Sequence, residues 1–282
     1  MPPIRLLAID IDGTLLNPQF QISDADLAAL RRAHQEGVEV VVVTGRRHTF
    51  ALPIVKQLGF DLWIISSNGA ITRSLSGETF HCDFLPAEAC RKLCKATPQF
   101  RGSMVLTFDV EGKGAVVLEG LSGELTASIQ RWLEKNIQYI DFVIPIENSL
   151  TTDPVQAMFC GSIERMHRAI DLISSGGVMG RVTVLRTEYP IRDLSIVDIL
   201  NQGCSKGHAL ERWANFRGIP REQVMAIGDN YNDIEMLAFA GLPFIMGNAS
   251  AELRGRGWTV TLPNDQCGVA AAIEQVLGVE VS

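Results

Sequence analysis

The chain has 282 residues, 46% of them hydrophobic, which is enough for one large domain or two smaller ones with buried cores. Its formal net charge of -7 comes from 32 acidic and 25 basic residues without long runs of one sign, which argues against a nucleic-acid-binding surface. No apolar run approaches the length of a membrane-spanning helix, and the six cysteines form no CxxC pair or zinc-ligand spacing. We therefore expect a soluble, cytoplasmic protein that binds neither nucleic acid nor membrane, with its oligomeric state left open.

The first part of the chain alternates apolar strands with an amphipathic helix. Three apolar runs suit strands that are covered by helices on both faces: residues 4–9, 38–43 and 61–65. Between the first two, Ser23 followed by Asp26 predicts a helix N-cap, and Gly37 predicts the helix end. This strand, helix, strand order implies parallel pairing through right-handed crossovers. We therefore predict an α/β fold whose core is a doubly wound, Rossmann-like parallel sheet.

The pattern changes between residues 84 and 195. Expected strands at 103–108 and 115–119 are separated by a short turn that contains Gly112 and Gly114, as in a β-hairpin. Further helical and strand patterns follow in the same segment, which indicates an α+β module with a partly antiparallel sheet. We treat residues 84–195 as an insertion into the first fold.

Beyond the insertion the buried pattern of the first part returns. Residues 223–227 and 242–246 are typical of buried strands, and each is followed by a glycine. The predicted domains are therefore a core made of residues 1–83 and 196–282, and an inserted α+β domain made of residues 84–195.

Four polar clusters lie at predicted strand ends or helix starts, where an open α/β sheet binds its ligands. They are Asp-Ile-Asp-Gly-Thr at 10–14, Thr-Gly-Arg at 44–46, Ser-Lys-Gly at 205–207 and Gly-Asp-Asn-Tyr-Asn-Asp at 228–233. The first motif alone would arise by chance in roughly one chain in a thousand of this size. Four clusters in register with strand ends point to a common site.

The carboxylates of these clusters predict a magnesium site. Asp10, Asp12 and Asp229 would repel one another, and a hard divalent cation with oxygen ligands relieves that repulsion. Asp10 can attack phosphorus and form an aspartyl-phosphate that water then hydrolyses. Asp12 can protonate the leaving oxygen and then activate that water.

The other clusters predict groups that bind the phosphate. Lys206 would place a cation beside the oxygens of the transferred phosphoryl group. Thr44 and the backbone N–H of Gly45, at a helix start, offer hydrogen bonds to the same anion.

The four motifs, in this order, resemble those of the haloacid dehalogenase superfamily, and the resemblance covers the whole chain. The tail, with Met-Gly-Asn-Ala at 246–249, Asn-Asp at 264–265 and Gly-Val-Ala at 268–270, resembles the Cof-type branch, subfamily IIB. That branch carries its larger insertion between the second and third motifs. Dehalogenase members lack the second aspartate of the first motif, so Asp12 favours phosphoryl chemistry.

The resemblance implies a role for each motif. Asp10 would be the nucleophile and a metal ligand, Asp12 the acid/base with its backbone carbonyl on the metal, and Asp229 a further metal ligand. Thr44 and Lys206 would act as catalytic residues that hold the phosphate. The predicted phosphate-binding set is completed by Gly13, Thr14, Gly45, Arg46 and Asn232.

Two assignments have alternatives. Asp233 is expected either to bind the metal directly or to make a structural hydrogen bond within its loop. Arg46 is expected either to touch the substrate or to cap a neighbouring strand.

The leading interpretation is a Mg²⁺-dependent phosphatase that hydrolyses a small phosphorylated metabolite, such as a sugar phosphate or a phosphorylated cofactor. The insertion would act as a cap that closes over the core and determines specificity. A sugar phosphomutase is the alternative. A non-catalytic binder of phosphorylated ligands and a phospho-accepting signalling domain are less favoured, because the catalytic set is complete and the acceptor follows the first strand.

Overall fold

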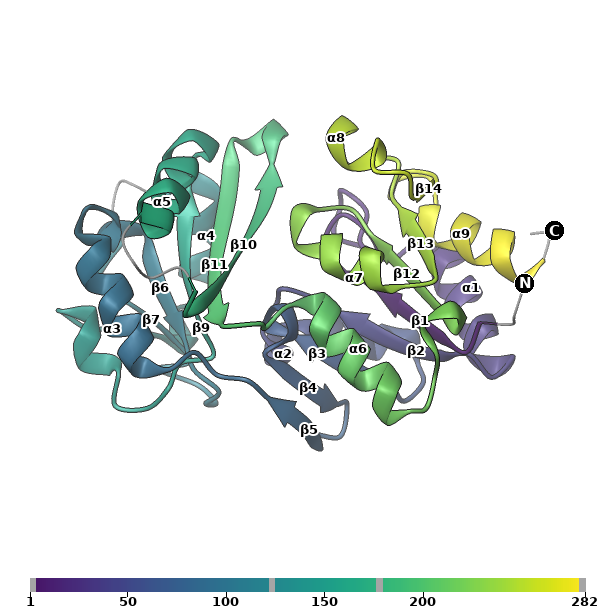
Figure 1. Ribbon diagram of the computed structural model, residues 1–282, viewed down its shortest axis with the longest axis horizontal. Coiled ribbons are helices and arrows are strands. Elements are labelled where there is room, and N and C mark those ends of the chain that lie inside the picture. Colours follow the sequence, from purple (N-terminus) through teal and green to yellow (C-terminus); the bar gives the residue numbers. More distant parts are fainter. Residues whose placement is uncertain (1–3, 122–124, 176–179, 279–282) are drawn as a thin grey trace. The chain divides into compact units, whose positions relative to one another are not determined.

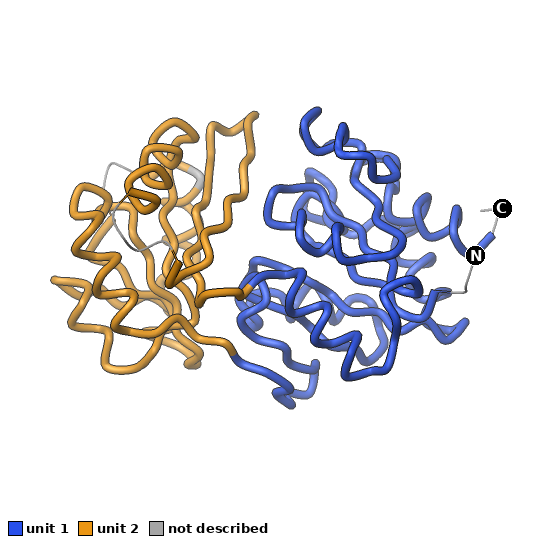
Figure 2. The backbone as a smooth tube through the Cα atoms, viewed as in Figure 1, with its two compact units in different colours: residues 1–82, 205–282 blue, residues 83–204 orange. Residues whose placement is uncertain are grey.

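The structure is a computed structural model that describes residues 4–121, 125–175 and 180–278. The chain divides into two compact units, shown in different colours in Figure 2. The core unit comprises residues 1–82 and 205–282, and the inserted unit comprises residues 83–204. None of the described helices is both long enough and apolar enough to cross a membrane.

The core unit is built on one eight-stranded sheet (Figure 1). Its strands are β1 (Leu6–Ile9), β2 (Glu39–Val43), β3 (Trp63–Ser66), β4 (Ile71–Ser74), β5 (Thr79–Cys82), β12 (Val224–Gly228), β13 (Leu242–Ile245) and β14 (Thr259–Val260). They lie in the order β14-β13-β12-β1-β2-β3-β4-β5. The six strands from β14 to β3 are parallel, and β4 and β5 extend the sheet as antiparallel strands.

Helices cover both faces of this sheet. They are α1 (Asp24–Gln35), α2 (His48–Val55), α6 (Lys206–Phe216), α7 (Ile234–Phe239), α8 (Ala251–Arg254) and α9 (Gly268–Leu277). Successive side chains of a strand point to opposite faces, so β1 supplies two hydrophobic clusters. Leu7 and Ile9 pack with residues of α1, α2 and α9, whereas Leu6 and Ala8 pack with residues of α6, α7 and α8. The predicted doubly wound α/β fold is confirmed.

The described residues of the inserted unit form a six-stranded sheet and three α-helices. Its strands are β6 (Met104–Thr107), β7 (Val116–Leu118), β8 (Ile140–Phe142), β9 (Gln156–Gly161), β10 (Val182–Tyr189) and β11 (Leu194–Asn201), and its helices are α3 (Ala87–Ala96), α4 (Ala127–Lys135) and α5 (Ile163–Ser175). The strand order is β10-β11-β9-β6-β7-β8, and every neighbouring pair is antiparallel except β7 and β8. Residues of α3 and α5 pack on this sheet in a hydrophobic cluster of its own.

The second boundary between the units lies later than the sequence analysis placed it. The expected boundary between residues 195 and 196 falls inside β11. That strand pairs with β10 along its whole length, from Leu194 opposite Tyr189 to Asn201 opposite Val182. The inserted unit therefore keeps all of β11 and extends to Cys204.

Candidate active site

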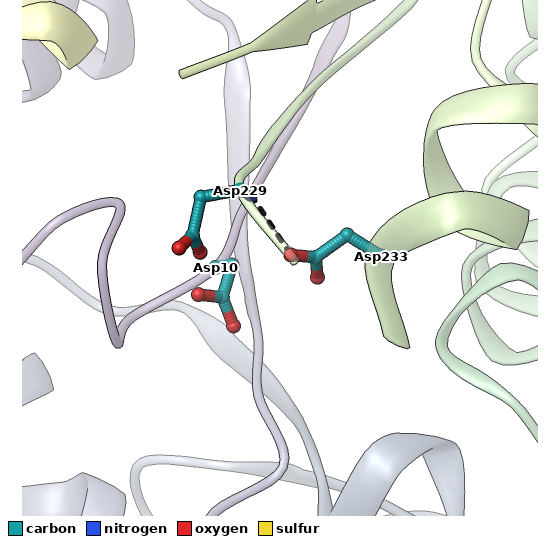
Figure 3. Close-up of side chains that lie close together, drawn as sticks. All are labelled: Asp10, Asp229 and Asp233. Atoms are coloured by element: carbon teal, nitrogen blue, oxygen red, sulfur yellow. Dashed lines mark hydrogen bonds between the residues drawn. The ribbon is translucent and has the colours of Figure 1, made fainter. Parts of the chain in front are cut away.

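Three buried aspartates lie together at the carboxyl ends of β1 and β12 (Figure 3). Asp10 directly follows β1, and Asp229 directly follows β12. These two strands are parallel neighbours, which brings together residues that are far apart in the sequence. Asp233 ends the short 3₁₀ helix that follows Asp229. One carboxylate oxygen from each of the three lies within 4.8 Å of the others.

Lys206 is the cation of this cluster. Its Nζ lies 2.6 Å from Asp10 Oδ1 and 2.6 Å from Asp233 Oδ1, and its side chain is buried. Burial lowers the pKa of Lys206, but the charges of Asp10 and Asp233 outweigh that effect and raise the pKa above its ordinary value. Lys206 therefore stays protonated, and it places a positive charge beside Asp10 and Asp233.

Local structure explains why Lys206 reaches the aspartates. Ser205 accepts a hydrogen bond from the backbone N–H of His208 and so caps α6, which makes Lys206 the first residue of the helix. Gly207 then lets α6 approach α7 closely, because a Cβ at this position would lie 2.6 Å from the backbone carbon of Glu235. The motif Ser-Lys-Gly thus combines a cap, a cation and a close packing contact.

The electrostatics of the cluster favour a divalent cation. Burial raises the pKa of Asp10 to about 7, against the lowering effect of Lys206. Burial also raises the pKa of Asp229 well above its ordinary value, and the charges of Asp10 and Asp233 add to this. One ammonium group does not neutralise three carboxylates. Hard oxygen ligands with an excess of negative charge suit a divalent cation such as Mg²⁺, and this cluster of Asp10, Asp229 and Asp233 could hold one.

Asp233 makes the structural hydrogen bonds that were one of its two expected roles. Its Oδ2 accepts hydrogen bonds from the backbone N–H groups of Asp229 and Asn230, each at 3.0 Å (Figure 3 shows the first). Its Oδ1 accepts from Lys206. A Cβ on Gly228 would lie 2.7 Å from the Asp233 side chain, so glycine is required there. Asp233 thus shapes its own loop and also belongs to the carboxylate cluster.

Gly13 and Thr14, predicted to bind phosphate, lie against Asp229. A Cβ on Gly13, whose φ is +88°, would lie 2.2 Å from Asp229 Oδ2. The Thr14 hydroxyl donates a hydrogen bond of 3.2 Å to Asp229 Oδ1. The Asn248 amide, which the sequence analysis did not place in the site, donates to the carbonyl oxygen of Gly13 at 2.8 Å. These contacts fix the Asp229 carboxylate from the side of the first motif.

Asp12 and Arg46 form a two-pronged ion pair. Arg46 Nε lies 2.7 Å from Asp12 Oδ2, and Arg46 Nη2 lies 2.6 Å from Asp12 Oδ1. Both side chains are 29% exposed, unlike the buried aspartates. The Asp12 carboxylate is therefore engaged by Arg46 and is not one of the three clustered carboxylates.

The second motif is joined to the fourth through a residue that the sequence analysis did not assign to the site. Thr44 is buried directly after β2, and its hydroxyl accepts a hydrogen bond from the backbone N–H of Arg46 at 3.1 Å. Asn68, in the turn after β3, donates its backbone N–H to the Thr44 carbonyl oxygen at 3.0 Å. The Asn232 amide donates to Asn68 Oδ1 at 2.9 Å. In the sequence, the pair Asn68-Gly69 predicts only a turn. Tertiary contacts place that turn beside the motifs, so no local pattern could have assigned Asn68 to the site.

The family model of the haloacid dehalogenase-like hydrolases matches residues 7–273, which include all four motifs. The chain belongs to this family. The candidate active-site residues of this haloacid dehalogenase-like hydrolase lie on the core unit. They come from two segments of the sequence that the inserted unit separates.

Curated relatives and solved structures agree with this assignment. Phosphatase YwpJ of Bacillus subtilis (strain 168) is 29% identical over 97% of this chain and 100% of its own length. HMP-PP phosphatase of Escherichia coli (strain K12 / DH10B) is 30% identical over 89% of this chain and 86% of its own. A haloacid dehalogenase-like hydrolase from Bacteroides thetaiotaomicron has a TM-score of 0.78 and 28% identity, over 97% of this chain and 99% of that chain. The predicted family and the prediction of an enzyme of the hydrolase class are confirmed.

Proposed function

We propose that this enzyme is a Mg²⁺-dependent phosphatase that hydrolyses a small phosphate monoester through an aspartyl-phosphate on Asp10. The observation that carries the proposal is the buried carboxylate of Asp10, which lies 2.6 Å from the Lys206 ammonium and clusters with Asp229. A carboxylate in this setting has a cation on one side and a candidate metal ligand beside it. The names of the two curated relatives, both phosphatases, support a phosphate ester as the substrate.

The first half of the reaction transfers the phosphoryl group to the enzyme. A carboxylate oxygen of Asp10 forms a bond to phosphorus while the bond between phosphorus and the leaving oxygen breaks. Asp12 gives a proton to the leaving oxygen, which departs as an alcohol. Lys206, Thr44 and the Gly45 backbone N–H stabilise the negative charge on the phosphoryl oxygens.

The second half restores the enzyme. Asp12, now a carboxylate, removes a proton from a water molecule that attacks phosphorus. The bond between phosphorus and the Asp10 oxygen breaks, and inorganic phosphate leaves. We assign Asp233 to a positioning role, because its oxygens accept from Lys206 and from two backbone N–H groups.

We assign the metal to Asp10 and Asp229, with the Asp12 backbone carbonyl as a third protein ligand. When bound, Mg²⁺ would supply positive charge against the phosphoryl oxygens and balance the excess charge of the carboxylates. Exhaustive treatment with EDTA is expected to abolish phosphate release, and added Mg²⁺ is expected to restore it. Undiminished activity in EDTA would remove the metal from this scheme.

Substitution of the nucleophile tests the covalent mechanism. Asp10→Asn keeps the size of the side chain but removes its nucleophilic charge, so we expect kcat to fall at least about a thousandfold. The measurement is Mg²⁺-dependent phosphate release from p-nitrophenyl phosphate. Asp24→Asn is the matched control, because Asp24 is exposed in the first turn of α1. Wild-type activity in the Asp10 variant would rule out attack by Asp10.

We further propose that the inserted unit determines which phosphate monoester is used, with sugar phosphates and phosphorylated cofactors as the leading classes. Such esters carry charge and do not cross bilayers freely, so we place the activity in the cytoplasm. A phosphate-release screen over a broad monoester panel, ranked by kcat/KM, would identify the class. Equal, low values for all compounds would contradict a role in selectivity.

A further inference from the structure

Asn68 contacts three of the residues that we assign to phosphate binding. Its backbone N–H donates to the carbonyl oxygen of Thr44 at 3.0 Å. Its side-chain Oδ1 accepts from Asn232 Nδ2 at 2.9 Å. The same side chain lies against Gly45, where an added Cβ would be 3.1 Å from Asn68 Oδ1 and 3.3 Å from Asn68 Nδ2. Asn68 therefore bridges two loops from different parts of the chain, because its backbone N–H is bonded to Thr44 and its buried side-chain amide to Asn232.

The backbone around Asn68 is strained. Ser67 has a φ of +49° and Asn68 a φ of +53°, so two consecutive residues other than glycine occupy the left-handed region. Asparagine tolerates this conformation, but serine does so poorly. Both residues are buried, and Ser67 Oγ has no hydrogen-bond partner among the described residues. Strain of this kind persists only where the surroundings enforce it, and it is concentrated at functional sites.

The strained turn is tied to the site at both ends. The Ser67 backbone N–H donates to the carbonyl oxygen of Arg46 at 2.8 Å, which fixes the turn to the second motif. Gly69, at a φ of +106°, packs so closely on the start of α6 that a Cβ would lie 2.3 Å from the Ser205 carbonyl oxygen. The turn therefore contacts the second, third and fourth motifs at once.

We propose that Asn68 is a positioning residue for phosphate binding. Its backbone bond to Thr44 keeps the side-chain amide beside Gly45, and the amide then holds Asn232 at the separation from the Thr44–Gly45 loop that the phosphoryl oxygens require. This role rests on the proposed phosphatase function, and it adds a fifth segment to the four motifs. The strain in the turn places the amide in the gap between the loops, where an unstrained turn would not hold it.

Asn68→Gly separates this role from a structural one. Glycine adopts a positive φ without strain, so we expect the turn to form and Tm to stay within a few degrees of the wild type. The amide is lost, so we expect kcat/KM for p-nitrophenyl phosphate with Mg²⁺ to fall about tenfold to a hundredfold, because small misplacements of binding groups are costly. A lowered Tm with unchanged kcat/KM would show that Asn68 serves only the fold.

A double-mutant cycle tests whether Asn68 acts through Asn232. If it does, Asn68→Gly costs less kcat/KM in an Asn232→Ala background than in the wild type. If each substitution lowers kcat/KM by the same factor in both backgrounds, Asn68 does not act through Asn232. Ser66→Ala is the matched control, because Ser66 is the buried last residue of β3, directly before the turn, and its hydroxyl donates to the Ile71 carbonyl oxygen at 3.3 Å, outside the phosphate-binding set. We expect this control to keep wild-type kcat/KM.

Asn68→Asp tests proximity to the phosphate in a second way, including the case in which the glycine variant does not fold. The aspartate keeps an oxygen that can accept the hydrogen bond of Asn232, but it adds a negative charge beside Gly45. We expect KM for p-nitrophenyl phosphate and the inhibition constant of inorganic phosphate each to rise about tenfold. Unchanged values would overturn the proposal. Failure of the proposed function is distinct, since it would appear as an Asp10→Asn variant that is still active.

Discussion

At the scale of single residues, the ion pair between Asp12 and Arg46 bears directly on the two proton transfers that we assign to Asp12. Arg46 binds both oxygens of Asp12, which fixes the orientation of the carboxylate. A lysine ammonium cannot make these two parallel hydrogen bonds to one carboxylate. We therefore expect Arg46→Lys to lower kcat about tenfold with little change in KM for p-nitrophenyl phosphate. Arg32→Lys is the control, since Arg32 pairs with Glu36 on the surface of α1. A raised KM with unchanged kcat would instead assign Arg46 to substrate binding.

The raised pKa of Asp10 predicts how stability depends on pH without metal. Its pKa of about 7 in the folded protein exceeds the ordinary value of 3.8, so the folded state favours the protonated carboxyl. The contribution of Asp10 to the free energy of unfolding is therefore greatest below about pH 4. That contribution is lost as pH rises to about 7. We expect the urea midpoint of the EDTA-treated wild type to fall across this range relative to Asp10→Asn, which lacks the titration. Parallel curves would contradict the assignment.

Metal binding should reverse that loss. A cation held by Asp10 and Asp229 binds only the folded state, so it should raise Tm at pH 7 by an amount that grows with Mg²⁺ concentration. At about one hundred times the dissociation constant the gain is about 2.7 kcal/mol. Thermal unfolding of the wild type and of Asp229→Asn in a series of Mg²⁺ concentrations measures this. An equal rise in both proteins would place the metal elsewhere.

The approach of Asp10, Asp229 and Lys206 could be predicted from the sequence, because each follows a strand or begins a helix at the same edge of a parallel sheet. The contacts around them could not. The Asp229 carboxylate lies so close to Gly13, on another loop, that residue 13 has no room for a Cβ, and no local pattern reveals this contact. Asn68 stands before a glycine in an apparently ordinary turn, and its left-handed backbone depends on tertiary contacts.

At the scale of elements, α9 receives its N-terminal cap from another helix. Cys267, which precedes α9, makes no side-chain cap, and Asp26 of α1 accepts a hydrogen bond from the Ala270 backbone N–H at 2.8 Å. Asp26 also receives the Ser23 hydroxyl at 2.7 Å. The Asp26 carboxyl thus joins the first and last helices of the core unit.

Removing this carboxyl should destabilise the core unit. Asp26→Ala leaves backbone N–H groups of α9 unsatisfied, and we expect it to cost about 2 kcal/mol of the free energy of unfolding. Asp26→Asn keeps an acceptor oxygen and should cost less, since burial already raises the pKa of Asp26 and disfavours its charge. Urea unfolding measures both, with the exposed Asp24→Ala as control. Equal effects at the two positions would argue against the cap.

The same helix shows what a local pattern can predict. Ser23 was expected to cap α1, and its hydroxyl does accept the Asp26 backbone N–H at 3.0 Å, so that prediction is confirmed. The second partner of Asp26 lies near the other end of the sequence, beyond the reach of any local signal. The end of the insertion was expected at residue 195 for a similar reason, because the pairing of β11 with β10 continues to Asn201 and no local pattern reveals that pairing.

At the scale of the whole molecule, the inserted unit has the features of an independent domain. Its sheet pairs only strands between Met104 and Asn201, and its hydrophobic cluster draws only on residues of the same unit. We expect residues 83–204, produced alone, to unfold in one cooperative transition. Circular dichroism during urea titration measures this. A gradual, non-cooperative change would show that the unit depends on the rest of the chain.

The position of β12 in the chain also sets an order of events during synthesis. β1 leaves the ribosome early, but β12, its partner in the sheet, is made roughly two hundred residues later. At usual rates of translation this leaves about 10 to 40 s in which β1 has only β2 available as a neighbour. The inserted unit is complete before β12 appears, so it can fold first. A nascent chain therefore carries Asp10 long before Asp229 and Asp233 are made, and it can acquire phosphatase activity only after β12 has emerged.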